Sequence, residues 1–109
     1  MRLNKKENEA LKKFRIKIEK LLLDNLVEVK LFGSKARGDA RKDSDLDVIV
    51  IISSGDWHTS DMIYGIATDI LIETGVCVSP KVITKEEYNH LRNIGNIFLK
   101  NVIREGIAI

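Results

Sequence analysis

Two aspartates interrupt an apolar run in the first half of the chain, in the segment "SDLDVIVII" at residues 44–52. Side chains alternate between the two faces of an extended strand, so Asp45 and Asp47 are expected on one face, with Cα atoms roughly 6.6–7 Å apart. A buried carboxylate is costly unless something neutralises it. Two carboxylates at this spacing could converge on one divalent cation, and hard oxygen ligands favour Mg²⁺ or Mn²⁺.

A glycine–serine turn lies shortly upstream, in "LFGSKARGD" at residues 31–39. A turn that opens into a helix presents free backbone N–H groups to an anion, and Gly33 would let a ligand approach the backbone closely. Because Mg²⁺ is commonly held by carboxylates together with substrate phosphates, the two segments predict one ligand, a metal-bound nucleoside triphosphate. Nearby basic residues could add positive charge beside the phosphates: Lys35, Arg37, Arg41 and Lys42.

Composition favours one globular domain over residues 1–109, with 44% hydrophobic and 31% charged residues. The single cysteine, Cys77, cannot form an intrachain disulfide, and no apolar run is long enough to span a membrane. The charged N-terminus also lacks an apolar signal core, so a cytoplasmic location is expected. Residues 1–44 carry a charge of +6 and residues 45–109 carry −4. Nucleic-acid binding through the basic N-terminal helix is therefore an alternative, weakened by the net charge of only +2.

Hydrophobic periodicity and turn residues predict an alternating order of helices and strands. Helices are expected over residues 5–24, 57–74, 85–94 and 96–105, and strands over 27–32, 45–52 and 76–83. A further short helix should have Ser34 as its N-cap and end at Gly38. Pro80 should place the third strand at a sheet edge or mark a bulge in it, and Thr84 with Glu87 should form a capping box. This order predicts an α/β fold, a small sheet covered by helices mostly on one side.

The motifs "GSKARG" and "SDLDVIV", in this order and spacing, resemble the nucleotidyltransferase signature of the polymerase beta superfamily. The chain is most similar to the minimal nucleotidyltransferases, which often form the antitoxin half of HEPN/MNT pairs, and the resemblance extends to "EGI" at residues 105–107. It implies the polymerase beta-like fold, with a small mixed sheet. It also implies transfer of a nucleoside monophosphate from ATP or another triphosphate to a hydroxyl acceptor, and the sequence leaves open whether that acceptor is a protein, RNA or a small molecule.

By motif position, the resemblance implies that Gly33 and Ser34 bind the triphosphate and that Asp45 and Asp47 are the catalytic metal ligands. Arg37 would be a phosphate contact or a structural contact. The cation would be Mg²⁺, with Mn²⁺ as an alternative. Because the chain stops at the core domain of this family, completing the cleft should require a HEPN-like helical partner, a homodimer or a macromolecular acceptor.

The sequence departs from the family at one functional position. Active relatives carry a third carboxylate on the strand after the long helix, whereas "VCVSPKVI" has none, and Cys77 or Ser79 is expected in its place. The alternative function is therefore a catalytically weakened protein that neutralises a HEPN-type partner by docking. The apolar C-terminal segment (Ile97, Phe98, Leu99, Val102 and Ile103) could provide that docking surface or could be ordinary core. Cys77 is expected to be buried, and Trp57 is expected to pack against the sheet.

Overall fold

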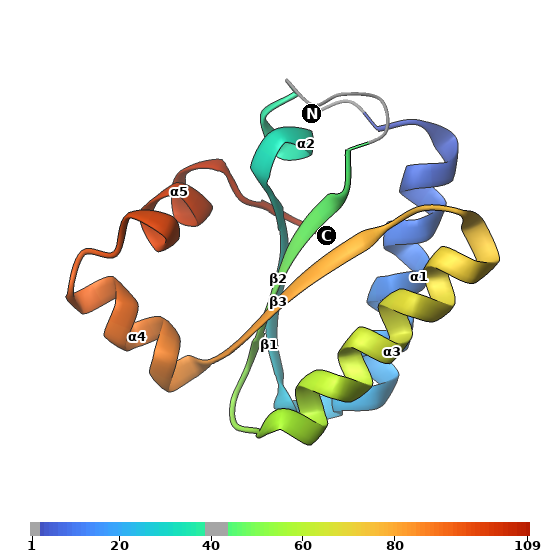
Figure 1. Cartoon of the computed structure of the whole chain (residues 1–109). Helices are drawn as coiled ribbons and strands as arrows, with labels where there is room; N and C mark the ends of the chain where they lie inside the picture. Colours follow the sequence, from blue (N-terminus) through green and yellow to red (C-terminus); the bar gives the residue numbers. More distant parts are fainter. Residues whose placement is uncertain (1–2, 39–43) are drawn as a thin grey trace.

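A computed structural model describes residues 3–38 and 44–109, which form a sheet with helices on both faces (Figure 1). The strands are β1 (Leu26–Phe32), β2 (Leu46–Ile52), β3 (Val78–Thr84) and β4 (Ile107–Ala108). The helices are α1 (Lys5–Leu22), α2 (Gly33–Arg37), α3 (Trp57–Thr74), α4 (Lys85–Asn93) and α5 (Ile97–Glu105), with a 3₁₀ turn at Leu23–Asn25. The predicted order of helices and strands is confirmed.

The sheet has the strand order β3-β2-β1-β4 and is mixed, as the resemblance implies. β1 pairs antiparallel with both β2 and β4, whereas β2 pairs parallel with β3. β3 is an edge strand, so Pro80 occupies the position predicted for it. β4 has only two residues and was not predicted.

Both faces of the sheet are covered by helices, and β2 lies at the centre of the core. α1 and α3, the two longest helices, pack on one face, where Phe14, Ile18, Ile63 and Ile70 join Val48 and Val50 of β2 in one buried cluster. α4 and α5 cover the other face, where Leu99 and Val102 pack against Ile49 and Ile51. The expectation that helices lie mostly on one side of the sheet is therefore only partly right. It describes α1 and α3 but omits the layer formed by α4 and α5 on the other face.

Local signals placed several element ends correctly. α3 has the predicted bounds, begins after an Asp56 cap and ends at Gly75 in the left-handed region. The capping box at Thr84 and Glu87 is also present. Trp57, however, is 67% exposed and does not pack against the sheet as predicted.

The C-terminal apolar segment divides between core and surface. Leu99 and Val102 are buried, whereas Ile97, Phe98 and Ile103 are at least 36% exposed. Across the described ranges, none of the helices combines the length and apolar character that a membrane span requires. The one-domain organisation over residues 1–109 stays a prediction.

Candidate functional site

The sheet register brings the two predicted motifs together. Phe32, the last residue of β1, pairs with Asp47 near the start of β2, so the turn at Gly33 lies beside that aspartate. A Cβ atom on Gly33 would come within 2.6 Å of Asp47 Oδ2. Gly33 also has a φ of +76°, a conformation that favours glycine. The close approach predicted at this glycine is therefore already used by the chain's own carboxylate.

Ser34 lies inside the first turn of α2 and is not its N-cap, so that detail of the prediction is wrong. The helix begins at Gly33, and its N-cap residue, Phe32, makes no side-chain capping bond. Gly38 ends the helix as predicted, in the left-handed region, and its N–H donates to the Ser34 carbonyl at 2.9 Å. Ser34 thus remains beside the turn, with its hydroxyl not used as a cap.

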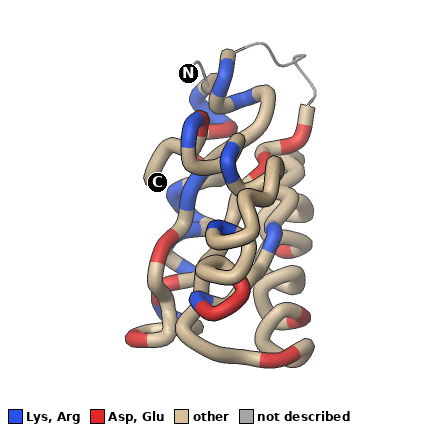
Figure 2. The backbone as a smooth tube through the Cα atoms, turned by 90° about the vertical axis from the view of Figure 1, so that its left-hand side faces the viewer, with Lys and Arg blue, Asp and Glu red and all other residues tan. Residues whose placement is uncertain are grey.

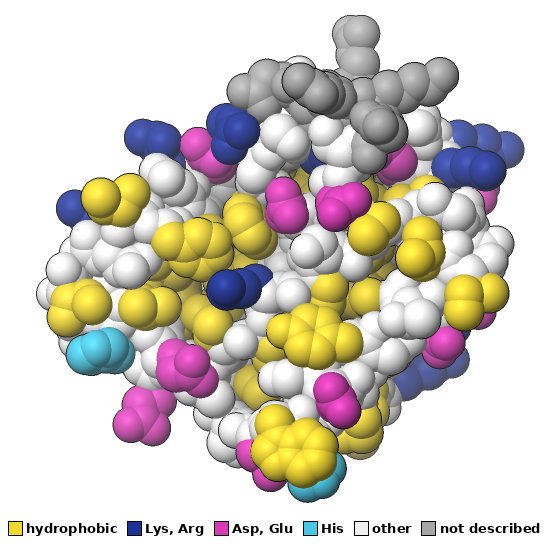
Figure 3. Space-filling view, in the orientation of Figure 1, with side chains coloured by type: hydrophobic (Ala, Val, Ile, Leu, Met, Phe, Trp, Pro, Cys, Tyr) yellow, Lys and Arg dark blue, Asp and Glu magenta, His cyan; other side chains and the backbone are white. Residues whose placement is uncertain are grey.

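The aspartate pair lies at the start of β2, where acidic side chains gather on the face shown in Figure 3. Asp45 is exposed, whereas Asp47 is half-buried. Burial raises the pKa of the Asp47 carboxyl, the charge of Asp45 raises it further, and Arg37 opposes both effects. The folded chain therefore holds two carboxylates that repel each other, an arrangement that a bound cation would relieve.

Cys77 and Ser79, the two residues expected at the third-carboxylate position, both lie near the aspartate pair. β3 runs parallel to β2, with Ser79 paired to Asp47, and the backbone N–H of Leu46 donates to the Cys77 carbonyl at 2.9 Å. The Cys77 side chain is exposed, not buried as predicted. Burial raises the pKa of its thiol, and the negative charges of Asp45 and Asp47 raise it further.

The donor set fits a divalent cation that also binds substrate phosphates. Two carboxylates are enough for Mg²⁺ when phosphate oxygens and waters complete the shell. Within residues 3–38 and 44–109, no group of three or more His, Cys, Asp or Glu side chains could hold a metal on its own. A metal carried by the nucleotide therefore fits this chain better than a permanently bound one.

Arg37 forms an ion pair that the sequence did not predict. Its Nη1 lies 3.2 Å from Oε2 of Glu105, at the end of α5. The positive charge of the same guanidinium opposes the rise in the pKa of Asp47, so Arg37 interacts with both Glu105 and the aspartate pair. In the sequence, Glu105 belongs to the "EGI" motif, and its spacing from Arg37 carries no signal of this contact.

The ammonium group of Lys35 is paired with a buried carboxylate. Its Nζ lies 2.7 Å from Glu7 Oε2, and both side chains are buried, although the sequence predicted a role beside phosphates. Other basic residues lie around α2 at the upper end of the molecule (Figure 2). Arg41 and Lys42, predicted to add positive charge, lie outside the described residues.

A cavity of about 270 Å³ lies between α3 and the start of β3, next to Cys77. It has mostly apolar walls, formed by Tyr64, Ala67, Thr68, Leu71, Cys77, Val78, Ser79 and Pro80. Ser79, which lines the cavity, pairs with Asp47 across β2 and β3, so the cavity opens near the aspartate pair.

The family follows from a match over most of the chain. Residues 9–97 match the model of the nucleotidyltransferase domain. The chain belongs to this family. Its fold is the polymerase beta-like nucleotidyltransferase fold, which confirms the resemblance seen in the sequence.

Individual relatives agree with this assignment. The chain is 31% identical over 100 residues to a Methanocaldococcus jannaschii protein named "Putative protein adenylyltransferase MJ0604", covering 92% of this chain and 94% of that one. A solved structure described as "putative minimal nucleotidyltransferase" is 27% identical, with a TM-score of 0.52, and the match covers 91% of this chain and 95% of that chain.

A solved toxin–antitoxin structure with AMP-PNP shares the fold. Its TM-score is 0.56 at 19% identity, and the match covers 87% of this chain and 68% of that chain. At this level of identity the similarity shows the fold alone.

Proposed function

We propose that the protein is a divalent-cation-dependent nucleotidyltransferase that transfers AMP from ATP to a hydroxyl of a protein. The observation that supports this most is the contact between the Gly33 turn and the Asp47 carboxylate, since it joins the triphosphate-binding turn to the metal ligands. The choice of a protein acceptor rests on the relative named as a protein adenylyltransferase, which aligns over nearly the whole of both chains.

Each site residue has a distinct proposed role. Gly33, without a Cβ, lets the turn lie directly against the Asp47 carboxylate, and Ser34 binds the triphosphate from the first turn of α2. Asp45 and Asp47 would hold Mg²⁺ or Mn²⁺, which supplies charge neutralisation at the reacting phosphate. Arg37 contributes positive charge near the same carboxylates.

Proton removal from the acceptor is the weakest part of this machinery. The raised pKa of Cys77 keeps its thiol protonated, and Ser79 is not a base, so neither replaces a carboxylate. We therefore expect slow transfer and infer that the acceptor must be presented in a reactive position by its own protein. The cavity between α3 and the start of β3, beside Cys77, offers one approach for that acceptor.

The biological setting we propose is the antitoxin half of a HEPN/MNT pair, with a HEPN-like helical protein as acceptor and partner. The toxin–antitoxin complex among the solved structures with this fold supports that setting. A homodimer is the other way to complete the cleft.

The alternative function is neutralisation by docking alone. It is supported by an unpaired apolar stripe along α3, where Trp57, Tyr64 and Leu71 recur every seven residues and are each at least 44% exposed. The stripe ends beside the cavity near Asp45, and Figure 3 shows hydrophobic side chains gathered over α3 on this face. A surface of this kind marks a protein interaction site.

A transfer assay separates the two functions. The chain is co-expressed with its helical partner, and the complex is incubated with ATP labelled at the α-phosphate. Label on the partner that depends on Mg²⁺ and is lost in Asp45→Asn/Asp47→Asn would support transfer. An unlabelled partner that is still neutralised by this double variant would favour docking.

A further inference from the structure

Glu105 is held between two arginines, one from the candidate site and one from its own helix. Its Oε2 accepts from Arg37 Nη1 at 3.2 Å, and its Oε1 accepts from Arg104 Nη2 at 3.2 Å. The Glu105 side chain is only 16% exposed, whereas that of Arg104 is 73% exposed. Both carboxylate oxygens therefore accept hydrogen bonds, and Arg37, the partner from α2, connects Glu105 to the candidate site.

The backbone next to Glu105 is fixed to the strand that leads into the site. Gly106 donates its N–H to the Val102 carbonyl at 2.7 Å, and Ile107 then pairs with Leu31 of β1, two residues before Gly33. A Cβ on Gly106 would come within 2.4 Å of the Val102 oxygen and 3.1 Å of Lys30 Cδ. This close packing restricts the backbone position of Glu105.

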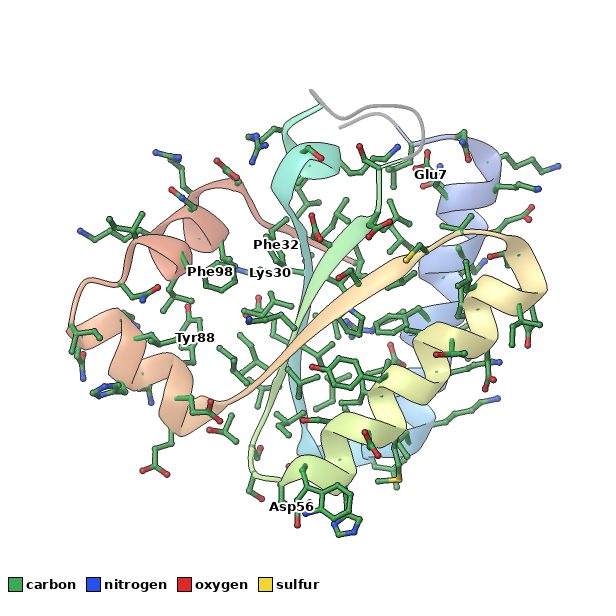
Figure 4. The ribbon with its side chains drawn as sticks, viewed as in Figure 1. Glu7, Lys30, Phe32, Asp56, Tyr88 and Phe98 are labelled. Atoms are coloured by element: carbon green, nitrogen blue, oxygen red, sulfur yellow. The ribbon has the colours of Figure 1, made fainter. Side chains whose placement is uncertain are left out.

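An aromatic contact joins the same two elements. Phe32 of β1 and Phe98 of α5 meet edge to face, with ring centroids 5.5 Å apart, and they face each other in Figure 4, with Lys30 beside them. Because Phe32 directly precedes Gly33, α5 is packed against the residue from which α2 starts. Glu105 thus extends from a rigid support towards the end of α2.

We propose that Glu105 is a positioning residue for nucleotide binding, which holds the Arg37 guanidinium at the end of α2 beside the aspartate pair. This inference rests on the proposed function, because it assumes that the aspartate pair and α2 bind a metal-bound triphosphate. It assigns to the "EGI" segment a role in that site although Glu105 itself touches no phosphate. It also combines the two roles expected for Arg37. The structural contact with Glu105 holds the guanidinium in place for a contact with phosphate.

The direction in which Glu105→Gln changes nucleotide affinity distinguishes positioning of Arg37 from a simple electrostatic effect. Removing the negative charge of Glu105 makes the neighbourhood more positive, so Coulomb interactions alone predict tighter binding of an anionic nucleotide. Loss of positioning predicts the opposite, because Arg37 would then lose its ion pair with the Glu105 carboxylate, which helps to order its side chain. Glu105→Gln therefore gives results of opposite sign under the two explanations.

The experiment is calorimetric titration of ATP with Mg²⁺ into the wild type, Glu105→Gln and a control, Glu86→Gln. Glu86 is an exposed glutamate in the first turn of α4, so its substitution removes the same charge elsewhere on the surface. We expect the Glu105→Gln dissociation constant to rise about three- to tenfold, with Glu86→Gln unchanged. An unchanged or lower dissociation constant for Glu105→Gln would overturn the inference.

A double-mutant cycle tests whether Glu105 acts through Arg37. In an Arg37→Ala background, Glu105→Gln should cause no further loss of affinity, because the group that it positions is already absent. A merely structural role predicts the same loss in both backgrounds and would also overturn the inference. Circular dichroism of each variant confirms that it is folded.

Gly106→Ala provides a second route to the same result if Glu105→Gln fails to fold. It leaves Glu105 and Arg37 in the sequence but displaces the segment that carries Glu105, so it should also weaken ATP binding. Absence of ATP binding by the wild type would overturn the proposed function together with the inference. Binding by the wild type that is unaffected by either variant would overturn the inference alone.

Discussion

Gly33 and Asp47 are in direct contact across the first two strands: a Cβ atom at Gly33 would lie 2.6 Å from Asp47 Oδ2. The contact exists because Phe32 and Asp47 are paired in the antiparallel register of β1 and β2. Two motifs separated by a basic segment in the sequence therefore lie side by side in the folded chain, and position 33 favours glycine both for its conformation and for its lack of a side chain.

Gly33→Ala should weaken ATP binding far more than a comparable substitution at the other end of α2. Gly38 provides the matched control, since it also has a positive φ, of +84°, but nothing lies within 4 Å of its added Cβ. Both variants should lose roughly 1–2 kcal/mol of stability from backbone strain, measured by urea denaturation. Only Gly33→Ala should displace Asp47, and equal ATP affinities in the two variants would contradict this.

Asp47→Asn should stabilise the metal-free protein at neutral pH. The folded-state pKa of Asp47 is raised above 3.8, which means that the folded protein prefers the protonated carboxyl. The contribution of this protonated carboxyl to stability is present below pH 3.8 and is lost as the pH rises through the folded pKa. The thermal midpoint of the variant should exceed that of the wild type by about 1–4 °C at pH 7 and converge with it in acid.

Mg²⁺ with ATP should reverse this order, since only the wild type keeps both metal ligands. The thermal midpoint of the wild type should rise with added ligand, and that of Asp47→Asn should not. A less stable Asp47→Asn at pH 7 without metal would show that the carboxylate is not under the repulsion described here.

Cys77→Asp should strengthen metal binding. It adds a carboxylate at a position where the charges of both aspartates already raise the pKa of the thiol, and the cation affinity of an oxygen site rises with the number of charged ligands. We expect an increase of about tenfold in Mn²⁺ affinity, measured by electron paramagnetic resonance, with Cys77→Ser as the control. Equal affinities in all three proteins would indicate that position 77 does not face the cation.

The buried pair of Glu7 and Lys35 should behave as a unit. Lys35→Met leaves the Glu7 carboxylate buried without its counter-ion and should lower the free energy of unfolding by roughly 3 kcal/mol. Glu7→Gln/Lys35→Met should recover most of that loss, since Gln can still accept from the Asn4 N–H as Glu7 does. The comparison is made by urea denaturation, and a double variant as unstable as the single one would contradict the coupling.

Periodicity and turn residues predicted the elements that position the site, because these signals are local. The alternation around Asp47 and the glycine after α3 are examples, and the family motif made Gly33 and Asp45 candidate site residues. Contacts between distant residues were not predictable in this way. Arg37 and Glu105 are 68 positions apart, and their meeting depends on how α5 packs against the sheet.

Tertiary packing also explains the two wrong burial predictions. Cys77 lies just before the edge strand β3, where no further strand covers it, and Trp57 begins α3 beyond the end of the sheet. Residue type favoured burial at both positions, but the topology left both exposed.

The central claim is that Gly33, Ser34, Asp45 and Asp47 form a working nucleotide site. Calorimetric titration of ATP into the protein, with and without Mg²⁺, and into Asp45→Asn/Asp47→Asn tests it most directly. The account predicts binding that requires Mg²⁺ and is lost in the variant. Binding that is equal with and without the metal, or equal in the two proteins, would contradict it.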